Sequence, residues 1–430
     1  MLRLSYRWNW LLLFALSLIQ CRSLTVSPIV QQTPIPIPSH SLTPSLAPLK
    51  QLVPQIQVST VFSSRSFAYP FHGSSITYPS RIAIDKEKNL YISHSIFKFT
   101  ITQVPAKSQL DQSIFLGPYK VAETGIYRFM GSDENTNSSH LSFPQGLAIS
   151  SSGTLYTSGS REFSDCVLKM KDTEKFISIE EFGKKYSHIP LKLNFLGAFA
   201  PITKDHESTS LGFKDGSFGE AQFKLCSEIE FDTEDNLYIV DRGNHSIRKL
   251  TPDGRVSTLA GTGKPGFADG SGTQAQFNNP VDVAVAPNGS VYVADATNLR
   301  VREIHPNGIV STLAGNGNTY PYTDEQRKST LIYGGFKDGL GSEAEFRSLN
   351  GITVNSKGYI YVTDFHAVRE ISPVGQVKTI AGSQEKGDKD GLGSEARFNG
   401  TDGIEVDQVD NLYVADELNH QIRKIIFSYE

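Results

Sequence analysis

One short loop is written four times in the second half of the chain, and this repetition constrains the fold more than any other feature. GFKDGLGSEAEF at 335–346 and GDKDGLGSEARF at 387–398 are nearly identical, and GFKDGSFGEAQF at 212–223 and GFADGSGTQAQF at 266–277 are weaker copies. A catalytic loop is normally needed once, whereas self-similar segments are typical of repeat folds. We therefore interpret this segment, named here the DG loop, as a structural connector.

Each DG loop is followed by the same order of short apolar runs. After residue 277 these runs occupy 281–285, 290–294, 300–304 and 309–313, and turns rich in Asn, Gly and Pro separate them. Runs of Val, Ile and Tyr between such turns are typical of strands joined by hairpins. One repeat is therefore predicted to be a four-stranded antiparallel meander.

The second strand of each unit carries a tyrosine, and this residue allows the units to be counted. Six such runs occur, with Tyr91, Tyr156, Tyr238, Tyr292, Tyr361 and Tyr413. Constant units joined by loops of variable length are expected for blades arranged around an axis. The predicted fold is all-β, a six-bladed β-propeller of four-stranded antiparallel blades.

The last unit has only three strands before the chain reaches residue 430. The missing fourth strand should resemble RVSTLAG, IVSTLAG and QVKTIAG of the earlier units, and QVSTVF at 57–62 does. An N-terminal strand that completes the last blade would close the ring and leave no open sheet edge. We predict this closure.

The combined pattern D-G-x-G-x-x-A-x-F, V-Y-V-A-D-x-x-N-x-x-[IV]-R and P-x-G-x-V-x-T-[LI]-A-G resembles the NHL-repeat family of β-propellers. The match covers 212–430, and the pattern is degenerate over 63–211, where YISH and YTSG lack the aspartate of YVAD. The resemblance implies a six-bladed propeller whose usual role is binding, although some related propellers are enzymes.

The N-terminus has the pattern of a secretory signal. Basic residues precede an apolar core at 11–19, which is followed by Cys21. This resembles the lipobox of a bacterial lipoprotein, although Gln20 stands where a small residue is usual; the resemblance implies cleavage after residue 20 and lipidation of Cys21. The alternative is a plain secretory signal with an incidental cysteine. Residues 21–55 are rich in Pro and Ser and predict a semi-rigid linker, which leaves 56–430 for the propeller.

Charge and cysteine content exclude several classes of protein. The formal net charge is −4 with no long basic run, so nucleic acid is not an expected partner. Three cysteines in 430 residues exclude a disulfide scaffold. The expected location is the cell envelope, on a bacterial membrane (the outer membrane first), with a monomeric propeller outside the cytoplasm. No cofactor is expected.

Two polar positions recur with the repeat and are interpreted as structural. An aspartate ends the second strand and an arginine lies on the third, where the two can pair across the hairpin. These residues are Asp241, Asp295, Asp364 and Asp416, with Arg248, Arg302, Arg369 and Arg423. The DG loops share at most two carboxylate positions, an Asp and a Glu five residues later, which are too few for calcium. His245, His366 and His420 are interpreted as hairpin residues. No metal site is predicted.

Residues that differ between repeats are better candidates for a binding site. The starts of the predicted innermost strands meet at the mouth of the channel, on the face that carries the DG loops. They supply Arg81, Gln145, Glu228, Asp282, Asn350 and Asp402. Two interpretations stay open here: these groups pair with one another at the rim, or they bind a ligand or a cation.

An insertion at 318–335 also breaks the repeat. Tyr320, Tyr322 and Tyr333 in it are residues that interfaces favour, and the alternative is a longer surface loop. The function predicted from these features is a binding platform for a protein or glycan on the DG-loop face. The alternatives are a metal-dependent enzyme of the lactonase or lyase type, with a cation near Glu228, Asp282 and Asp402, and a purely structural envelope protein. Enzyme activity is thus left open, with binding preferred.

Overall fold

The described part of the protein is built from antiparallel β-sheets. The computed structural model describes residues 54–63, 78–96, 98–104, 127–130, 143–161, 164–169, 194–196, 212–217, 220–324 and 329–428. Leu52–Glu430 forms one compact unit. The predicted signal, Cys21 and most of the linker lie outside the described residues. Within these ranges the helices are three-residue 3₁₀ turns, and none is long and apolar enough to cross a membrane.

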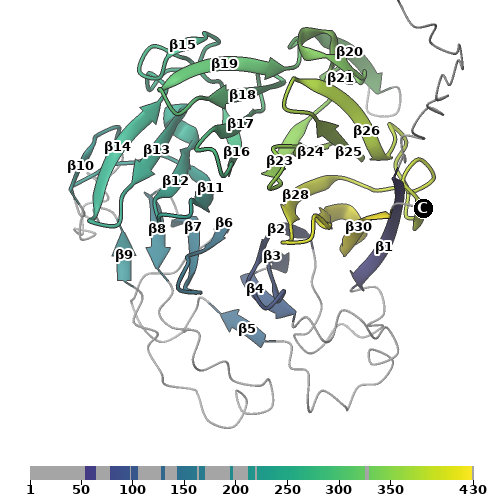
Figure 1. The fold of residues 1–430 in the computed structure, drawn as a ribbon, viewed down its shortest axis with the longest axis horizontal. Helices are drawn as coiled ribbons and strands as arrows, with labels where there is room; N and C mark the ends of the chain where they lie inside the picture. Colours follow the sequence, from purple (N-terminus) through teal and green to yellow (C-terminus); the bar gives the residue numbers. More distant parts are fainter. Residues whose placement is uncertain are drawn as a thin grey trace, which may run out of the picture. The chain divides into compact units, whose positions relative to one another are not determined.

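Three sheets follow the predicted repeat one after another (Figure 1). Their strands are β11 (Cys226–Phe231), β12 (Leu237–Asp241), β13 (Ser246–Leu250) and β14 (Arg255–Ala260), then β16 (Pro280–Val285), β17 (Val291–Asp295), β18 (Arg300–Ile304) and β19 (Ile309–Ala314), then β23 (Leu349–Val354), β24 (Ile360–Asp364), β25 (Ala367–Ile371) and β26 (Gln376–Gly382). Four of these strands, β16 to β19, fall within one residue of the predicted bounds. Short 3₁₀ turns η5 (Arg242–Asn244) and η6 (Gly341–Glu343) lie in the connections.

The two sheets from the first part of the chain have four strands each. They contain β2 (Pro79–Ile84), β3 (Leu90–Ile96), β4 (Lys98–Val104) and β5 (Tyr127–Met130), then β6 (Phe143–Ile149), β7 (Leu155–Arg161), β8 (Ser164–Lys169) and β9 (Asn194–Leu196). These are the sheets in which the sequence pattern is degenerate, and their meander order is nevertheless the same.

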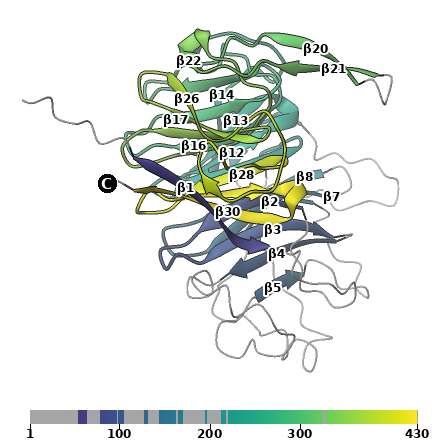
Figure 2. The same ribbon diagram turned by 90° about the vertical axis from the view of Figure 1, so that its right-hand side faces the viewer.

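The sixth sheet joins the two ends of the described chain. It contains β28 (Thr401–Val406), β29 (Leu412–Asp416) and β30 (Gln421–Ser428), with η7 (Glu417–Asn419) between the last two. Strand β1 (Gln55–Ser63) pairs antiparallel with β30, and Val58 lies opposite Ile425. Figure 2 shows β1 running beside β30. The pairing predicted between 57–62 and the last unit is therefore present.

The DG loops add a feature that four-stranded units did not predict. A two-residue strand from each loop pairs with the outermost strand of the sheet that follows it, because the connector passes along that edge before it turns inward. These strands are β10 (Gly216–Ser217), β15 (Gly270–Ser271), β22 (Gly339–Leu340) and β27 (Gly391–Leu392), and the last of them pairs with β1. Four of the sheets therefore have five strands.

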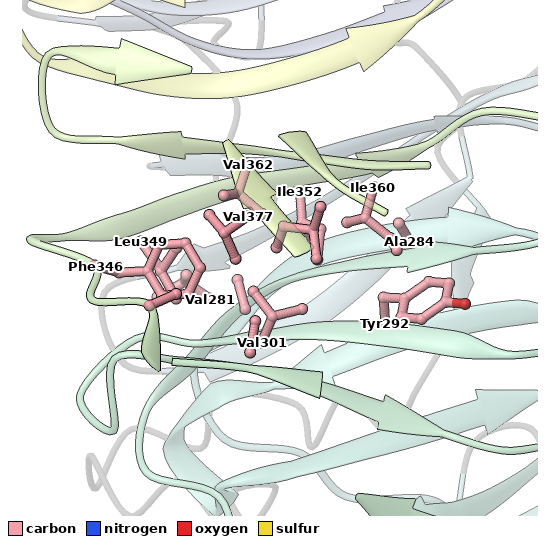
Figure 3. Packing of buried hydrophobic residues seen from close by; sticks show 14 of the residues in the cluster. Val281, Ala284, Tyr292, Val301, Phe346, Leu349, Ile352, Ile360, Val362 and Val377 are labelled. Carbon is pink, nitrogen blue, oxygen red and sulfur yellow. The ribbon is translucent and has the colours of Figure 1, made fainter. Parts of the chain in front are cut away.

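Neighbouring sheets pack face to face through apolar side chains. Figure 3 shows one such layer, in which Val281 and Val301 of one sheet meet Leu349, Ile352 and Val362 of the next. The plug predicted in each DG loop is part of these layers, since its Ala and Phe are buried in all four copies. The first strands β2, β6, β11, β16, β23 and β28 each contact the next in this order, and β28 contacts β2.

Candidate functional site

The repeated aspartate and arginine form a buried ion pair in each of four sheets. Arg302 Nη1 lies 3.0 Å from Asp295 Oδ2, and neither side chain is exposed. The same pair occurs as Arg248–Asp241, Arg369–Asp364 and Arg423–Asp416, at 2.7, 2.5 and 2.8 Å. The shorter hairpin after Asp364 keeps this pair, because Arg369 still lies opposite Val362 in the ladder.

The aspartate of the DG loop completes this network, which the sequence did not predict. Asp269 Oδ1 lies 2.5 Å from Arg302 Nη2 and also accepts from the hydroxyl of Thr312 at 3.1 Å. The two terminal nitrogens of the guanidinium thus bind one carboxylate each. The ring centres of Phe267 and Phe277 lie 4.9 and 5.2 Å from Cζ of Arg302. The recurrence of Asp-Gly together with the Thr of the fourth strand was the signal available in the sequence.

The candidate residues at the starts of the innermost strands meet around Arg81. Its Nε lies 2.9 Å from Glu228 Oε2, and its Nη1 lies 2.8 Å from Asp402 Oδ1. The same guanidinium donates to the backbone carbonyls of Gln145 and Asn350, at 3.1 and 3.3 Å. One buried side chain of β2 therefore binds groups from four other sheets.

Asp282, the remaining candidate, binds backbone groups. Its two carboxylate oxygens accept from the amides of Val283 and Ile352 at 2.6 and 2.8 Å, which ties β16 to β23. Glu228 does the same for β6, since its Oε1 accepts from the Leu147 amide at 2.7 Å. Gln145 and Asn350 bind Arg81 through their backbone carbonyls and not through their side chains. The side-chain amide of Asn350 instead donates to the Thr401 carbonyl at 2.8 Å.

Glycines follow three of these candidate residues because the inner strands approach each other closely. A Cβ on Gly403 would lie 2.4 Å from the Ser80 carbonyl oxygen, and one on Gly351 would lie 2.5 Å from that of Asp402. Gly146 has the same relation to Ser227. The sequence pairs Gln-Gly, Asn-Gly and Asp-Gly at these strand starts therefore reflect backbone packing between sheets.

A small cavity lies beside Arg81 between the inner strands. Its volume is about 50 Å³, which accommodates a few water molecules but not a drug-sized ligand. Carboxyl groups of Glu228, Glu230, Asp282 and Glu405 line it. Burial raises the pKa of all four, to about 7 for Asp282 and about 8 for Glu405.

The pKa of Glu228 reflects two opposed effects. Burial and the neighbouring Asp282 raise it, whereas Arg81 and two backbone amides lower it. We infer that Glu228 is ionised at neutral pH, because its oxygens accept from Arg81, Leu147 and Ile229. Burial and the neighbouring carboxyl groups of Glu405, Glu228 and Asp282 raise the pKa of Glu230.

The described residues contain no group of three or more His, Cys, Asp or Glu side chains placed to hold a metal. The three hairpin histidines instead accept hydrogen bonds through Nδ1 from backbone amides of the next sheet. His245 binds Asn279, His366 binds Gly400 and His420 binds Tyr78, at 3.0, 2.9 and 3.1 Å. Their contact with the next sheet was missed, although their position before the third strand was correct.

The tyrosine insertion is a two-stranded ribbon. Strands β20 (Thr319–Asp324) and β21 (Ser329–Gly334) pair antiparallel, with Tyr320 opposite Tyr333. Tyr320 is 47% exposed and donates to Glu345 at 2.9 Å, while Tyr333 packs near Phe365. Ile332 is 71% exposed. The side chain of Tyr322 lies outside the described residues.

Sheets of this kind and the repeated ion-pair network define an all-β repeat protein of the propeller type. Residues 277–304 match the family described as NHL repeat. NHL repeat-containing protein 2 of Bos taurus is 29% identical over 251 residues, which is 50% of this chain and 32% of that protein. SUPPRESSOR OF QUENCHING 1 of Arabidopsis thaliana is 39% identical over 97 residues, 22% of this chain and 9% of that protein.

Solved structures with the same fold come from Bacteroides. A structural genomics protein of unknown function from Bacteroides thetaiotaomicron has a TM-score of 0.56 and 17% identity, over 87% of this chain and 77% of that chain. An auxiliary nutrient binding protein from Bacteroides ovatus has a TM-score of 0.55 and 15% identity, over 87% and 78%. The chain spans about a third or less of the curated relatives named above. The predicted NHL repeat is confirmed at residues 277–304, and relatives that contain NHL repeats match the chain over a wider range.

Proposed function

We propose that the six sheets are the blades of a closed six-bladed propeller that binds a protein or glycan on its DG-loop face. Closure is supported by the pairing of β1 with β30 and by the unbroken order of contacts from β2 to β28 and back. In an antiparallel meander the DG loops and the hairpins after each second strand lie at the same end of the strands. This end therefore carries the loops that differ most between sheets.

The proposal rests on one observation: the protein's own groups bind the guanidinium of Arg81. Glu228, Asp402 and two backbone carbonyls take up its donors, and the cavity beside it is small. A ligand of ordinary size has no room at this depth. The residues at the channel mouth thus hold the sheets together. We infer that a ligand binds to the surface formed by the loops above them.

The ribbon β20–β21 is the part of that surface best suited to a partner. It interrupts one DG connector and presents Tyr320 and Ile332 to solvent. Aromatic and large apolar side chains supply most of the binding energy at interfaces when they become buried. The fold likeness to an auxiliary nutrient binding protein is compatible with a glycan or nutrient partner.

A pair of matched variants tests this proposal. Ile332→Asp alters the ribbon, and Val409→Asp alters a residue that is 60% exposed in the turn between β28 and β29, at the opposite end of the strands. Both are screened against a glycan array and against purified envelope proteins. We expect a ligand that the wild type and Val409→Asp bind equally and that Ile332→Asp binds at least about ten-fold more weakly. Ligands that bind Ile332→Asp as tightly as the wild type but no longer bind Val409→Asp would contradict the proposed role of the ribbon.

We propose further that Cys21 is lipidated and tethers the propeller to a bacterial membrane, outside the cytoplasm, through the linker at 21–55. The support is the apolar core at 11–19 followed by Cys21. Metabolic labelling with a palmitate analogue tests this, with Cys21→Ala as the control. Label on the wild type alone supports lipidation, and label on neither chain contradicts it.

One observation favours the alternative of an enzyme. Carboxyl groups with raised pKa values line a cavity, and such groups are common where proton transfer occurs. A catalytic cation near Glu228, Asp282 and Asp402 would be required for the lactonase or lyase type. The metal measurement described at the end of the Discussion separates this alternative from a binding platform.

A further inference from the structure

At three places, two neighbouring sheets are joined by the same kind of hydrogen bond, in which a histidine ring is the acceptor. In each, a histidine that directly precedes the third strand accepts a hydrogen bond from the backbone amide just before the first strand of the next sheet. The pairs are His245 with Asn279, His366 with Gly400, and His420 with Tyr78. We name each of these contacts a histidine clasp. The third clasp joins the last sheet to the first.

The chemistry of a clasp requires a neutral ring. A neutral imidazole has one nitrogen that accepts and one that donates, whereas an imidazolium donates from both. Because the partner in every clasp is a backbone N–H, a proton on Nδ1 places two donors face to face. The clasp must then open, and the amide loses its partner unless water replaces the ring.

The surroundings of His366 and His245 resist protonation. His366 is 6% exposed, its ring lies 3.8 Å from that of Phe365, and the charged groups that face it are the cations Arg347 and Lys386. Burial and these cations lower its pKa to about 4. Burial and Lys224 also lower the pKa of His245, whose own turn contributes Arg242. No carboxylate among these groups compensates an added proton.

The clasped amides lie next to the residues at the channel mouth. Gly400 precedes β28 and its Asp402, Tyr78 precedes β2 and its Arg81, and Asn279 precedes β16 and its Asp282. A clasp therefore fixes the entry of an inner strand, and through it the position of a rim residue. Tyr78 is also held by its ring, which lies edge-on to His420 at 4.4 Å; Asp416 and Glu417 are carboxyl groups of that hairpin, and burial raises the pKa of both.

We propose that the histidine clasps are an acid-sensitive device: protonation at Nδ1 opens them and loosens the starts of three inner strands at the channel mouth. This inference does not depend on which ligand the propeller binds. A mildly acidic environment would loosen the entries of these inner strands.

The direction of the effect follows from linkage. A clasped histidine with a lowered pKa binds fewer protons than an open one with an ordinary pKa of about 6.5, so closed clasps lose stability as the pH falls from about 6.5 to about 4. For His366 the open population should rise roughly 70-fold between pH 7.5 and pH 4.5. The cavity carboxyls have raised pKa values and act in the opposite direction on global stability, so a local measurement is needed.

Hydrogen exchange of the Gly400 amide in the full chain supplies that measurement. Rates are corrected for the intrinsic pH dependence of exchange and compared between the wild type and His366→Asn. The Asn side-chain oxygen can accept the same hydrogen bond but does not titrate. We expect the protection of Gly400 to fall by tens of fold on acidification in the wild type and by less than three-fold in His366→Asn.

Two outcomes would overturn the proposal. One is a loss of protection below about five-fold in the wild type, and the other is an equal loss in both proteins. If His366→Asn does not fold at pH 7.5, the pair His245→Asn and the Asn279 amide gives the same comparison, because Asn tolerates the left-handed conformation of residue 245 at φ 51°. His305→Asn, on an outer strand pair with Glu303 and Ser311, is the control for loss of a histidine elsewhere.

Discussion

Asp390 accepts hydrogen bonds from the backbone amide and the side-chain hydroxyl of Thr60, at 2.9 and 3.0 Å, although 330 residues separate the two in the chain. The same carboxylate lies 2.7 Å from Arg423. Asp338 binds Thr379 and Arg369 in the same way within a single stretch of sequence. Strand β1 therefore takes the place of the fourth strand in the last sheet, and Thr60 makes the hydrogen bonds that Thr379 makes in the preceding sheet.

A double-mutant cycle on Thr60→Val and Asp390→Asn tests this contact. Loss of the hydroxyl should cost about 1 kcal/mol in the free energy of unfolding, and loss of the carboxylate that serves Arg423 about 1–3 kcal/mol. The coupling should be about 0.5–1.5 kcal/mol. Urea unfolding of the four proteins measures it. The cycle on Thr379→Val and Asp338→Asn is the matched control, and additive effects at Thr60 and Asp390 alone would contradict the docking of β1.

Arg302→Met should be among the most destabilising single changes on the third strands. It leaves buried Asp295 without its cation and removes the contact with Asp269, and breaking a buried pair in this way costs about 3–5 kcal/mol. Arg255→Met, at an exposed position, should change the free energy of unfolding by less than about 0.5 kcal/mol. Thermal melts compare the two. Equal stability of both variants would refute a structural role for the repeated arginine.

Glu405→Gln should flatten the dependence of stability on pH. Burial raises the pKa of Glu405 to about 8 in the folded protein, so the folded state holds a proton that the unfolded state releases near its ordinary value. Stability from this group is present at low pH and is lost as the pH rises from about 4.5 towards 8, by up to about 1.4 kcal/mol per unit. Urea unfolding at pH 5, 6.5 and 8 measures the slope; an unchanged slope in the variant would show that Glu405 is ionised throughout.

The repeat allowed most of the sheet structure to be predicted from sequence. Hairpin turns and β-branched runs are local signals, so the strands from β16 to β19 were placed within one residue. The pairing of 57–62 with the last sheet was also predictable, because QVSTVF repeats a fourth-strand sequence. The paired edge strands of the DG loops were not, since two-residue strands have no periodicity of their own.

The candidate site could be predicted only as a set of residues. Sequence alignment of the strand starts found Arg81, Glu228 and Asp402 but left open whether they bind each other or a ligand. Their distances depend on how closely the inner strands pack, which the glycines at 146, 351 and 403 permit. The roles of His366 and of Asp269 were missed for the same reason, because each contacts a group in another repeat or on another strand.

Metal content of the purified full chain, before and after chelation and paired with thermal melts, tests the central claim most directly. In the proposed binding platform, Arg81 and backbone amides occupy the carboxylates at the channel mouth. We therefore expect less than about 0.1 metal ion per chain and the same melting temperature with chelator, calcium or zinc. A stoichiometric metal that chelation removes, with a lower melting temperature afterwards, would contradict it and favour the metal-dependent enzyme.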